Sequence, residues 1–239
     1  MYQPDGIANF RVGRKSYLVT ANEGDARDYP GFAEEARARA IRTQYPGLPE
    51  VADDRQLGRL TVTTAVPGGD LSRPYVFGAR SFTIWDAATG ERVWDSGSEL
   101  EVRTAAALPA FFNSDNTVDN FDNRSDNKGP EPEGVAIGEV DGRTYAFIGL
   151  ERIGGVMVYD VTDPRAPEFV DYLTARSFGA TFGPDSGPEI VRFVDRENSP
   201  TGRPMLVVAH EITGTVTMWS LGRSRGDDRR DQWDDDSRD

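Results

Sequence analysis

Apolar and polar residues alternate with a period of two along several short stretches of the chain, and turn residues separate these stretches. The clearest run predicts a strand at 135–140, a turn at Asp141-Gly142 and a second strand at 144–150. An Asp-Gly pair between two alternating stretches is typical of a β-hairpin. After Glu151 and a Gly154-Gly155 turn, residues 156–160 predict a third strand, so we expect antiparallel sheet here.

The same order of elements occurs near both ends of the chain. Asp5-Gly6 precedes two predicted strands and Glu23, and residues 58–63 predict the third strand. Glu189 likewise precedes two strands and Glu211, and residues 214–219 follow. Repeated antiparallel strands of this size are typical of β-propellers and related all-β folds. With a further hairpin, four blade-like units are predicted, at 4–66, 75–104, 132–175 and 187–221.

The residues between these units differ in composition. An insertion is expected at 24–57, with a short helix at 32–44 between two prolines. Residues 113–131 are rich in Asp and Asn, and they predict either oxygen ligands for a hard cation or a solvated loop with Asx turns. Residues 222–239 carry many charges and few apolar residues, so we expect a disordered tail.

Carboxylates repeat together with the strands. Asp5 and Glu23 are 18 residues apart, as are Glu133 and Glu151, whereas Glu189 and Glu211 are 22 apart because of a longer turn. The first acid of each pair precedes one strand and the second follows its antiparallel partner, so both belong at one end of the hairpin. Six carboxylates are therefore predicted to gather at one rim of the fold.

Composition narrows the chemistry. The chain has 239 residues, a net charge of −13, no cysteine and one histidine, His210. Thiolate sites and sites with two or three histidines are excluded. The negative charge argues against nucleic-acid partners, and no apolar run is long enough to cross a membrane. We expect His210 to be an ordinary residue at a strand end, because no nucleophile motif accompanies it.

A ring of carboxylates repels itself unless cations neutralise it. The candidate basic and anion-binding partners are Arg27, Arg80, Arg124, Lys128 and Arg152. Salt bridges to these residues and a bound Ca²⁺ or Mg²⁺ satisfy the charge equally well. The sequence leaves both alternatives open.

Four long motifs carry a resemblance to a known family: 20–29 (TANEGDARDY), 77–82 (FGARSF), 124–134 (RSDNKGPEPEG) and 145–155 (YAFIGLERIGG). They resemble the choice-of-anchor I family of secreted or surface-attached bacterial β-propeller proteins, from about residue 4 to 221. The resemblance implies that this chain covers the C-terminal half of the usual domain, so the missing N-terminal half or another surface protein is the expected partner.

The Pro-Glu-Gly pattern is similar, more distantly, to esterase-like phytase propellers, which hold Ca²⁺ in an acidic channel. That resemblance implies metal-facing carboxylates at Glu133, Glu151, Glu189 and Glu211, with Asp5 and Glu23 as the third pair. Ile190 departs from the pattern, because glycine follows the first acid in the other two units.

The sequence thus predicts an all-β fold, a β-propeller of the YncE- or phytase-like type with an incomplete ring of about four blades. Residues 1–221 form the blades, with the insertion at 24–57 and the polar loop at 113–131. The leading functional hypothesis is a secreted or surface-displayed binding or scaffold protein with a Ca²⁺-stabilised acidic channel. The alternatives are an inactive fragment of a larger propeller and a Ca²⁺-dependent, phytase-like phosphoesterase.

Overall fold

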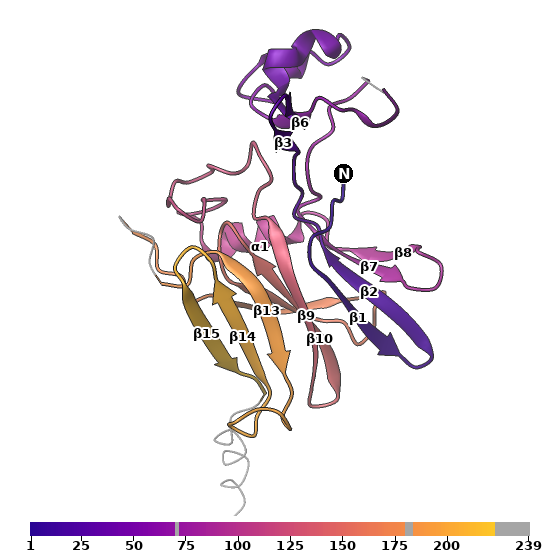
Figure 1. The fold of residues 1–239 in the computed structure, drawn as a ribbon, viewed down its shortest axis with the longest axis vertical. Helices are drawn as coiled ribbons and strands as arrows, with labels where there is room; N and C mark the ends of the chain where they lie inside the picture. Colours follow the sequence, from indigo (N-terminus) through magenta and orange to yellow (C-terminus); the bar gives the residue numbers. More distant parts are fainter. Residues whose placement is uncertain (70–71, 180–183, 223–239) are drawn as a thin grey trace, which may run out of the picture.

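The computed structural model describes residues 1–69, 72–179 and 184–222, and it is mostly antiparallel β-sheet. Figure 1 shows the sheets in the lower part of the molecule and the insertion, with β3 and β6, above them. Among the described residues, no helix is both long enough and apolar enough to cross a bilayer. The prediction of an all-β fold is confirmed.

Three large sheets follow one another along the chain. The first has the order β1-β2-β7-β8, formed by Ile7–Val12, Lys15–Ala21, Phe82–Asp86 and Arg92–Asp95. The second has the order β12-β11-β10-β9, formed by Glu168–Leu173, Val156–Asp160, Arg143–Leu150 and Pro132–Val140. The third has the order β13-β14-β15, formed by Pro188–Val194, Met205–His210 and Thr215–Ser220.

Turn residues form the hairpins that the sequence predicts. Val140 pairs with Arg143 across Asp141 and Gly142, which have φ values of 51° and 79°. Two positive φ values are those of the type I′ turn that suits the twist of a hairpin. Two aspartates cap the turns that follow their strands, because Asp86 accepts a hydrogen bond from the Ala88 amide and Asp160 accepts one from the Thr162 amide, both at 2.9 Å.

The first strands of the three sheets, β1, β9 and β13, lie side by side in that order. Two glycines allow this approach. A Cβ at Gly6 would lie 2.2 Å from the carbonyl oxygen of Glu133, and one at Gly134 would lie 2.7 Å from that of Glu189. Both distances are far below van der Waals contact, so a side chain at either position would push the neighbouring strands apart.

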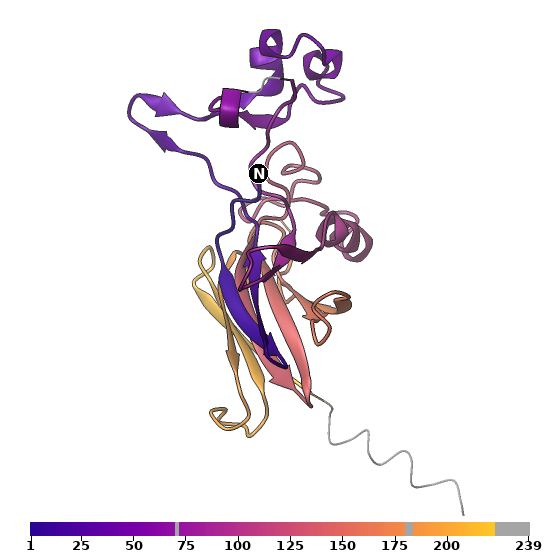
Figure 2. The same cartoon turned by 90° about the vertical axis from the view of Figure 1, so that its right-hand side faces the viewer.

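Apolar side chains fill both spaces between successive sheets. Between the first and second sheets the core includes Val19, Phe82, Ile148 and Tyr159, and between the second and third it includes Phe147 and Leu206. The helix α1 (Glu99–Ala107) buries Leu100 in the first of these cores. Figure 2 shows the sheets from the side, with the insertion extending away from them.

The insertion and the residues that follow it, up to Gly69, share a small cluster of apolar residues, which includes Ala38, Tyr45, Val51 and Val62. This part of the chain contains the strands β3 (Asp28–Tyr29), β4 (Phe32–Ala33), β5 (Glu35–Arg37) and β6 (Thr61–Thr63), and the 3₁₀ helices η1 (Ala38–Gln44), η2 (Pro49–Ala52) and η3 (Pro67–Gly69). The predicted helix at 32–44 is thus helical only over η1, because its first residues pair as strands.

Two further expectations need correction. Residues 61–63 pair with β5 of the insertion, and β7 occupies the position beside β2 that was predicted for 58–63. The hairpin within 75–104 therefore completes the first sheet, and four predicted units become three sheets. The described residues form no closed ring, so the propeller itself stays a prediction. Residues 223–239 of the predicted tail lie outside the described residues.

Candidate functional site

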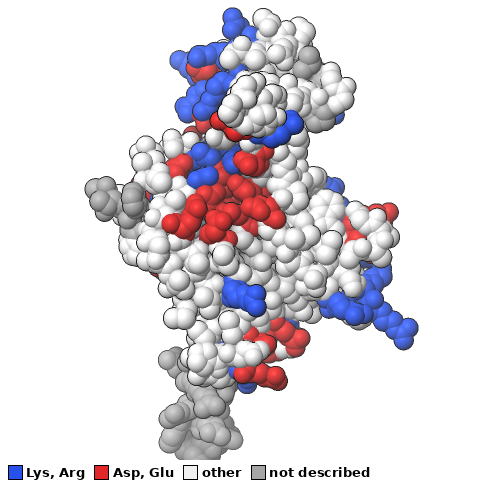
Figure 3. All heavy atoms as spheres, in the orientation of Figure 1, with Lys and Arg blue, Asp and Glu red and all other residues white. Residues whose placement is uncertain are grey.

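Most of the predicted carboxylates lie at one end of the first two hairpins. Asp5 precedes β1, Glu23 follows β2 and Glu133 lies in β9, and each places one carboxylate oxygen within 4.8 Å of the others. Glu151, which follows β10, forms a second such group with Glu23 and Glu131. Figure 3 shows a continuous acidic patch on the face of the sheets below the insertion, with basic side chains directly above it.

The third predicted pair, Glu189 and Glu211, contributes less to the carboxylate cluster. Glu189 in β13 is close enough that its charge helps to raise the pKa of Glu133. Glu211 follows β14 and is exposed, and neither carboxylate group within the described residues includes Glu189 or Glu211. The pairing of β13 and β14 shifts between Pro188 and Ile190, beside Glu189. The structure therefore brings together four of the six predicted ligands in groups of three, and places Glu189 beside them.

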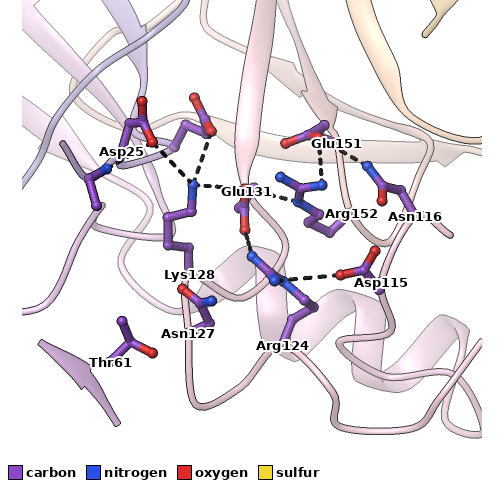
Figure 4. Close-up of polar contacts among 12 residues, drawn as sticks. Asp25, Thr61, Asp115, Asn116, Arg124, Asn127, Lys128, Glu131, Glu151 and Arg152 are labelled. Carbon is purple, nitrogen blue, oxygen red and sulfur yellow. Dashed lines mark hydrogen bonds and ion pairs between the residues drawn. The ribbon is translucent and has the colours of Figure 1, made fainter. Parts of the chain in front are cut away.

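Glu131 is the residue that the sequence interpretation missed. Its side chain is fully buried, and its backbone has a φ of 51° just before β9 begins. It forms ion pairs with Arg124, with Lys128 at 3.2 Å and with Arg152 at 3.0 Å, as Figure 4 shows. Burial alone would raise the pKa of Glu131, but these three charges outweigh burial and hold the pKa below its usual value.

Glu133 lies two residues further along and has the opposite surroundings. No ion pair within the described residues reaches its carboxylate, and its buried Oε2 atom has no hydrogen-bond partner there. Burial, together with the charges of Glu151, Glu189, Glu23 and Asp5, raises its pKa to about 9. Negative charge at this position is therefore uncompensated by side chains of the described chain.

Glu151 and Glu23 are intermediate between Glu131 and Glu133, because each has a cationic partner and yet a raised pKa. Glu151 accepts a hydrogen bond from the Asn116 amide at 3.0 Å and pairs with Arg152 at 2.9 Å, yet burial raises its pKa to about 8. Glu23 contacts Lys128 at 3.4 Å, and burial raises its pKa to about 7 despite that charge. At neutral pH the cluster therefore holds either protons or an additional cation.

Three of the five predicted basic residues, Arg124, Lys128 and Arg152, converge on Glu131. The other two have different partners. Arg80 pairs with Glu101 at 3.0 Å and donates to the carbonyl oxygens of Ser125 and Asn127, and Arg27 pairs with Glu34 at 2.8 Å inside the insertion. The salt-bridge alternative thus applies to Glu131, Glu151 and Glu23, whereas no ion pair within the described residues involves Glu133.

The polar loop 113–131 contacts the cluster through Asn116, Arg124 and Lys128. Asn113, Ser114 and Asn116 are buried, so the expectation of a solvated loop is wrong for this part. Arg176, whose side chain is fully buried, holds the loop by pairing with Asp119 at 2.9 Å and donating to the Asp115 carbonyl at 2.8 Å. The loop contributes Glu131 to a carboxylate group, and its Asp side chains belong to neither group.

His210 lies at the end of β14, as expected, and is buried. Its Nε2 atom lies 3.2 Å from the Thr217 hydroxyl and 3.8 Å from Asp185. Burial lowers its pKa, and the Asp185 charge only partly opposes this effect. His210 is thus a packed strand-end residue of the third sheet.

Comparisons with known proteins identify relatives. Gigasin-3a of Magallana gigas is 32% identical over 192 residues, which cover 73% of this chain and 68% of that protein. The mesenchyme-specific cell surface glycoprotein of Strongylocentrotus purpuratus is 29% identical over an alignment of 263 positions, which covers 91% of this chain and 31% of that protein. No solved structure matches. The family model of the choice-of-anchor I domain matches residues 1–164, and the chain belongs to this family.

Proposed function

We propose that the protein is a secreted or surface-displayed binding or scaffold protein whose acidic cluster holds Ca²⁺. The surface location rests on the family and on the similarity to a protein named as a cell surface glycoprotein. The metal rests on one observation above all, which is that Glu133 is a partly buried carboxylate with no cationic partner among the described residues.

The geometry of Asp5, Glu23 and Glu133 suits a hard cation. Ca²⁺ binds carboxylate oxygens at about 2.3–2.6 Å, so two oxygens on one ion are at most about 5 Å apart. The three carboxylates already have oxygens within 4.8 Å of one another. They come from two different sheets, so an ion at this position would join the first sheet to the second.

Protons compete with the metal for the same oxygens. The raised pKa values of Glu133, Glu151 and Glu23, about 9, 8 and 7, mean that the folded chain holds protons there at neutral pH when no cation is bound. Binding of a divalent cation must release these protons. We therefore expect affinity for Ca²⁺ to rise with pH between about 6 and 9.

A phytase-like phosphoesterase stays a second candidate, because three cations lie beside the acidic cluster. Such an enzyme needs a cation that can hold the phosphate while a metal-bound water attacks it. Arg124, Lys128 and Arg152 are each paired with buried Glu131. Since these ion pairs would have to be given up, the binding role ranks first, and an inactive fragment with salt-bridged carboxylates is the remaining alternative.

The test is a thermal melt of the full chain in EDTA and then in excess Ca²⁺ or Mg²⁺. A ligand that binds only the folded state raises the midpoint. Two variants on the same strand are compared, Glu133→Gln and the exposed control Glu139→Gln. We expect Ca²⁺ to raise the midpoint of the parent and of Glu139→Gln, with little effect on Glu133→Gln. A midpoint that ignores Ca²⁺ in all three proteins rejects both the metal site and the phosphoesterase.

A further inference from the structure

Glu23 belongs to two groups of carboxylates that differ in their partners. It forms one group with Asp5 and Glu133, the residues of the proposed Ca²⁺ site, with oxygens within 4.8 Å of one another. It forms the second group with Glu131 and Glu151, which are ion-paired to arginine. Glu23 is therefore the residue through which the proposed metal site adjoins the neutralised part of the cluster.

Lys128 already supplies a positive charge to Glu23. Its Nζ atom lies 3.4 Å from Oε1 of Glu23 and 3.2 Å from Oε2 of Glu131. The Lys128 side chain is 10% exposed, and it also reaches the carboxylate of Asp25 at 4.0 Å. Figure 4 shows the ammonium group between these carboxylates. The chain thus places a cation of its own at the edge of the proposed metal site.

A metal ion and this ammonium group would compete for Glu23. Ca²⁺ binds carboxylate oxygens at about 2.3–2.6 Å, so an ion on Oε1 of Glu23 would lie within about 6 Å of the Lys128 Nζ atom. Positive charges this close repel each other strongly at a partly buried position. The ion pair between Lys128 and Glu23 is therefore expected to weaken when a divalent cation binds.

Hydrogen bonds hold the backbone before Lys128, whereas its side chain has a choice of partners. Arg80 donates to the carbonyl oxygens of Ser125 and Asn127 at 2.7 and 2.6 Å. These bonds fix the segment that leads into Lys128. Its flexible side chain ends among several carboxylates, so the ammonium group keeps Glu131 as a partner when it gives up another. An exchange of partners therefore needs no rearrangement of the loop.

We propose that Lys128 is a built-in competitor of the metal, which neutralises Glu23 in the metal-free protein and gives it up when a divalent cation binds. This inference rests on the proposed Ca²⁺ site and adds the regulation of that site. Metal binding exchanges one ion pair for a metal–carboxylate bond, so the ammonium group lowers the affinity for the cation. Lys128 thus sets the affinity of the site without binding the metal.

The test compares the parent chain with three variants. Lys128→Met removes the charge and keeps an unbranched side chain of similar length, whereas Lys128→Arg keeps the charge. Lys15→Met is the matched control, because Lys15 is the other lysine of the chain and is exposed at the start of β2. Isothermal titration calorimetry measures the affinity for Ca²⁺. Thermal melts in EDTA and in excess Ca²⁺ measure the midpoint of unfolding.

We expect Lys128→Met to bind Ca²⁺ at least about tenfold more tightly than the parent, because the repulsion between the two cations is removed. In EDTA the same variant should unfold at a lower temperature, since Glu23 and Glu131 lose a cationic partner. Lys128→Arg and Lys15→Met should bind Ca²⁺ within about threefold of the parent. A residue that only supports the fold would lower both stability and affinity, so the opposite signs identify a competitor.

The outcomes separate this inference from the metal site itself. If the parent binds Ca²⁺ and Lys128→Met binds it equally or more weakly, the competitor role is overturned and the metal site stands. An equal gain in Lys15→Met would reveal a general charge effect and would also overturn the role. Binding by Lys128→Met without binding by the parent would support competition in its strongest form. Binding by none of the four proteins would reject the metal site and the competitor together.

The parent chain offers a second measurement that needs no substitution at Lys128. Acetylation followed by mass spectrometry reports the reaction rate of each of the two lysines. We expect excess Ca²⁺ to speed acetylation of Lys128 relative to Lys15, because the ammonium group loses its contact with Glu23. An unchanged ratio of the two rates, at a Ca²⁺ concentration that saturates the parent in calorimetry, would contradict the exchange of partners.

Discussion

Glu131 and Glu133 lie on either side of Pro132, and their carboxylates have opposite charge surroundings and opposite pKa shifts. Glu131 is fully buried among Arg124, Lys128 and Arg152, and its pKa is lowered. Glu133 is less buried and has no cationic partner among the described residues, and its pKa is raised to about 9. Burial itself acts in the same direction on both carboxylates, so the neighbouring charges decide the difference.

The backbone explains how two such close residues reach different surroundings. Residues i and i+2 of a regular strand point to the same side. Glu131 precedes β9 with a positive φ, so it leaves this pattern and contacts Arg124, which lies earlier in the polar loop. Glu133 lies within the strand and meets Asp5 and Glu23 of the first sheet. One carboxylate thus holds the loop in place, and the other is available to a ligand.

The largest expected effect on the free energy of unfolding comes from Glu131→Gln, which removes the carboxylate that the three cations neutralise. It leaves buried cations without their shared partner, and removing one member of a buried ion pair costs about 3–5 kcal/mol. The measurement is urea unfolding at neutral pH, with Glu139→Gln as the control for a charge on the same segment. A loss below about 1 kcal/mol would mean that the three cations are stabilised by other groups.

The pH dependence of stability tests the carboxylates that lack full charge compensation. Glu23, Glu151 and Glu133 have folded-state pKa values raised from 4.5 to about 7, 8 and 9. The folded chain thus binds more protons than the unfolded chain between about pH 4.5 and 9, so its unfolding free energy falls as the pH rises through that range. We expect this fall in EDTA and a smaller fall in Ca²⁺. Urea unfolding at pH 5, 7 and 9 measures it, and a rise with pH in EDTA would contradict the raised values.

The smallest effect is expected for Glu133→Gln without metal. Glutamine resembles the protonated form of Glu133, so stability at pH 7 should change by less than about 1 kcal/mol. At pH 10, where the parent carboxylate is charged, the variant should be the more stable protein. A large loss in EDTA at pH 7 would show that Glu133 has a structural partner. The two substitutions, Glu131→Gln and Glu133→Gln, should therefore differ strongly in their effect on the free energy of unfolding at pH 7.

The sequence alone determined the class of the fold and much of the carboxylate cluster. Alternating apolar residues and the Asp141-Gly142 turn predict antiparallel hairpins. The 18-residue spacing places Glu23 in one carboxylate group with Asp5, and it places Glu151 close enough to Glu133 for its charge to raise the pKa of Glu133. These features follow from local geometry, because strand period and turn type depend on residues close in sequence. The assignment of residues 58–63 to the first sheet failed, since pairing between distant strands is not encoded locally.

Only the tertiary structure decided which carboxylate is neutralised. Glu131 and Glu133 have similar neighbours in the sequence, yet the fold brings Lys128, Arg124 and Arg152 to the first and the acids of the first sheet to the second. Charge compensation and packing depend on distances across sheets, and no pattern along the chain reports those distances.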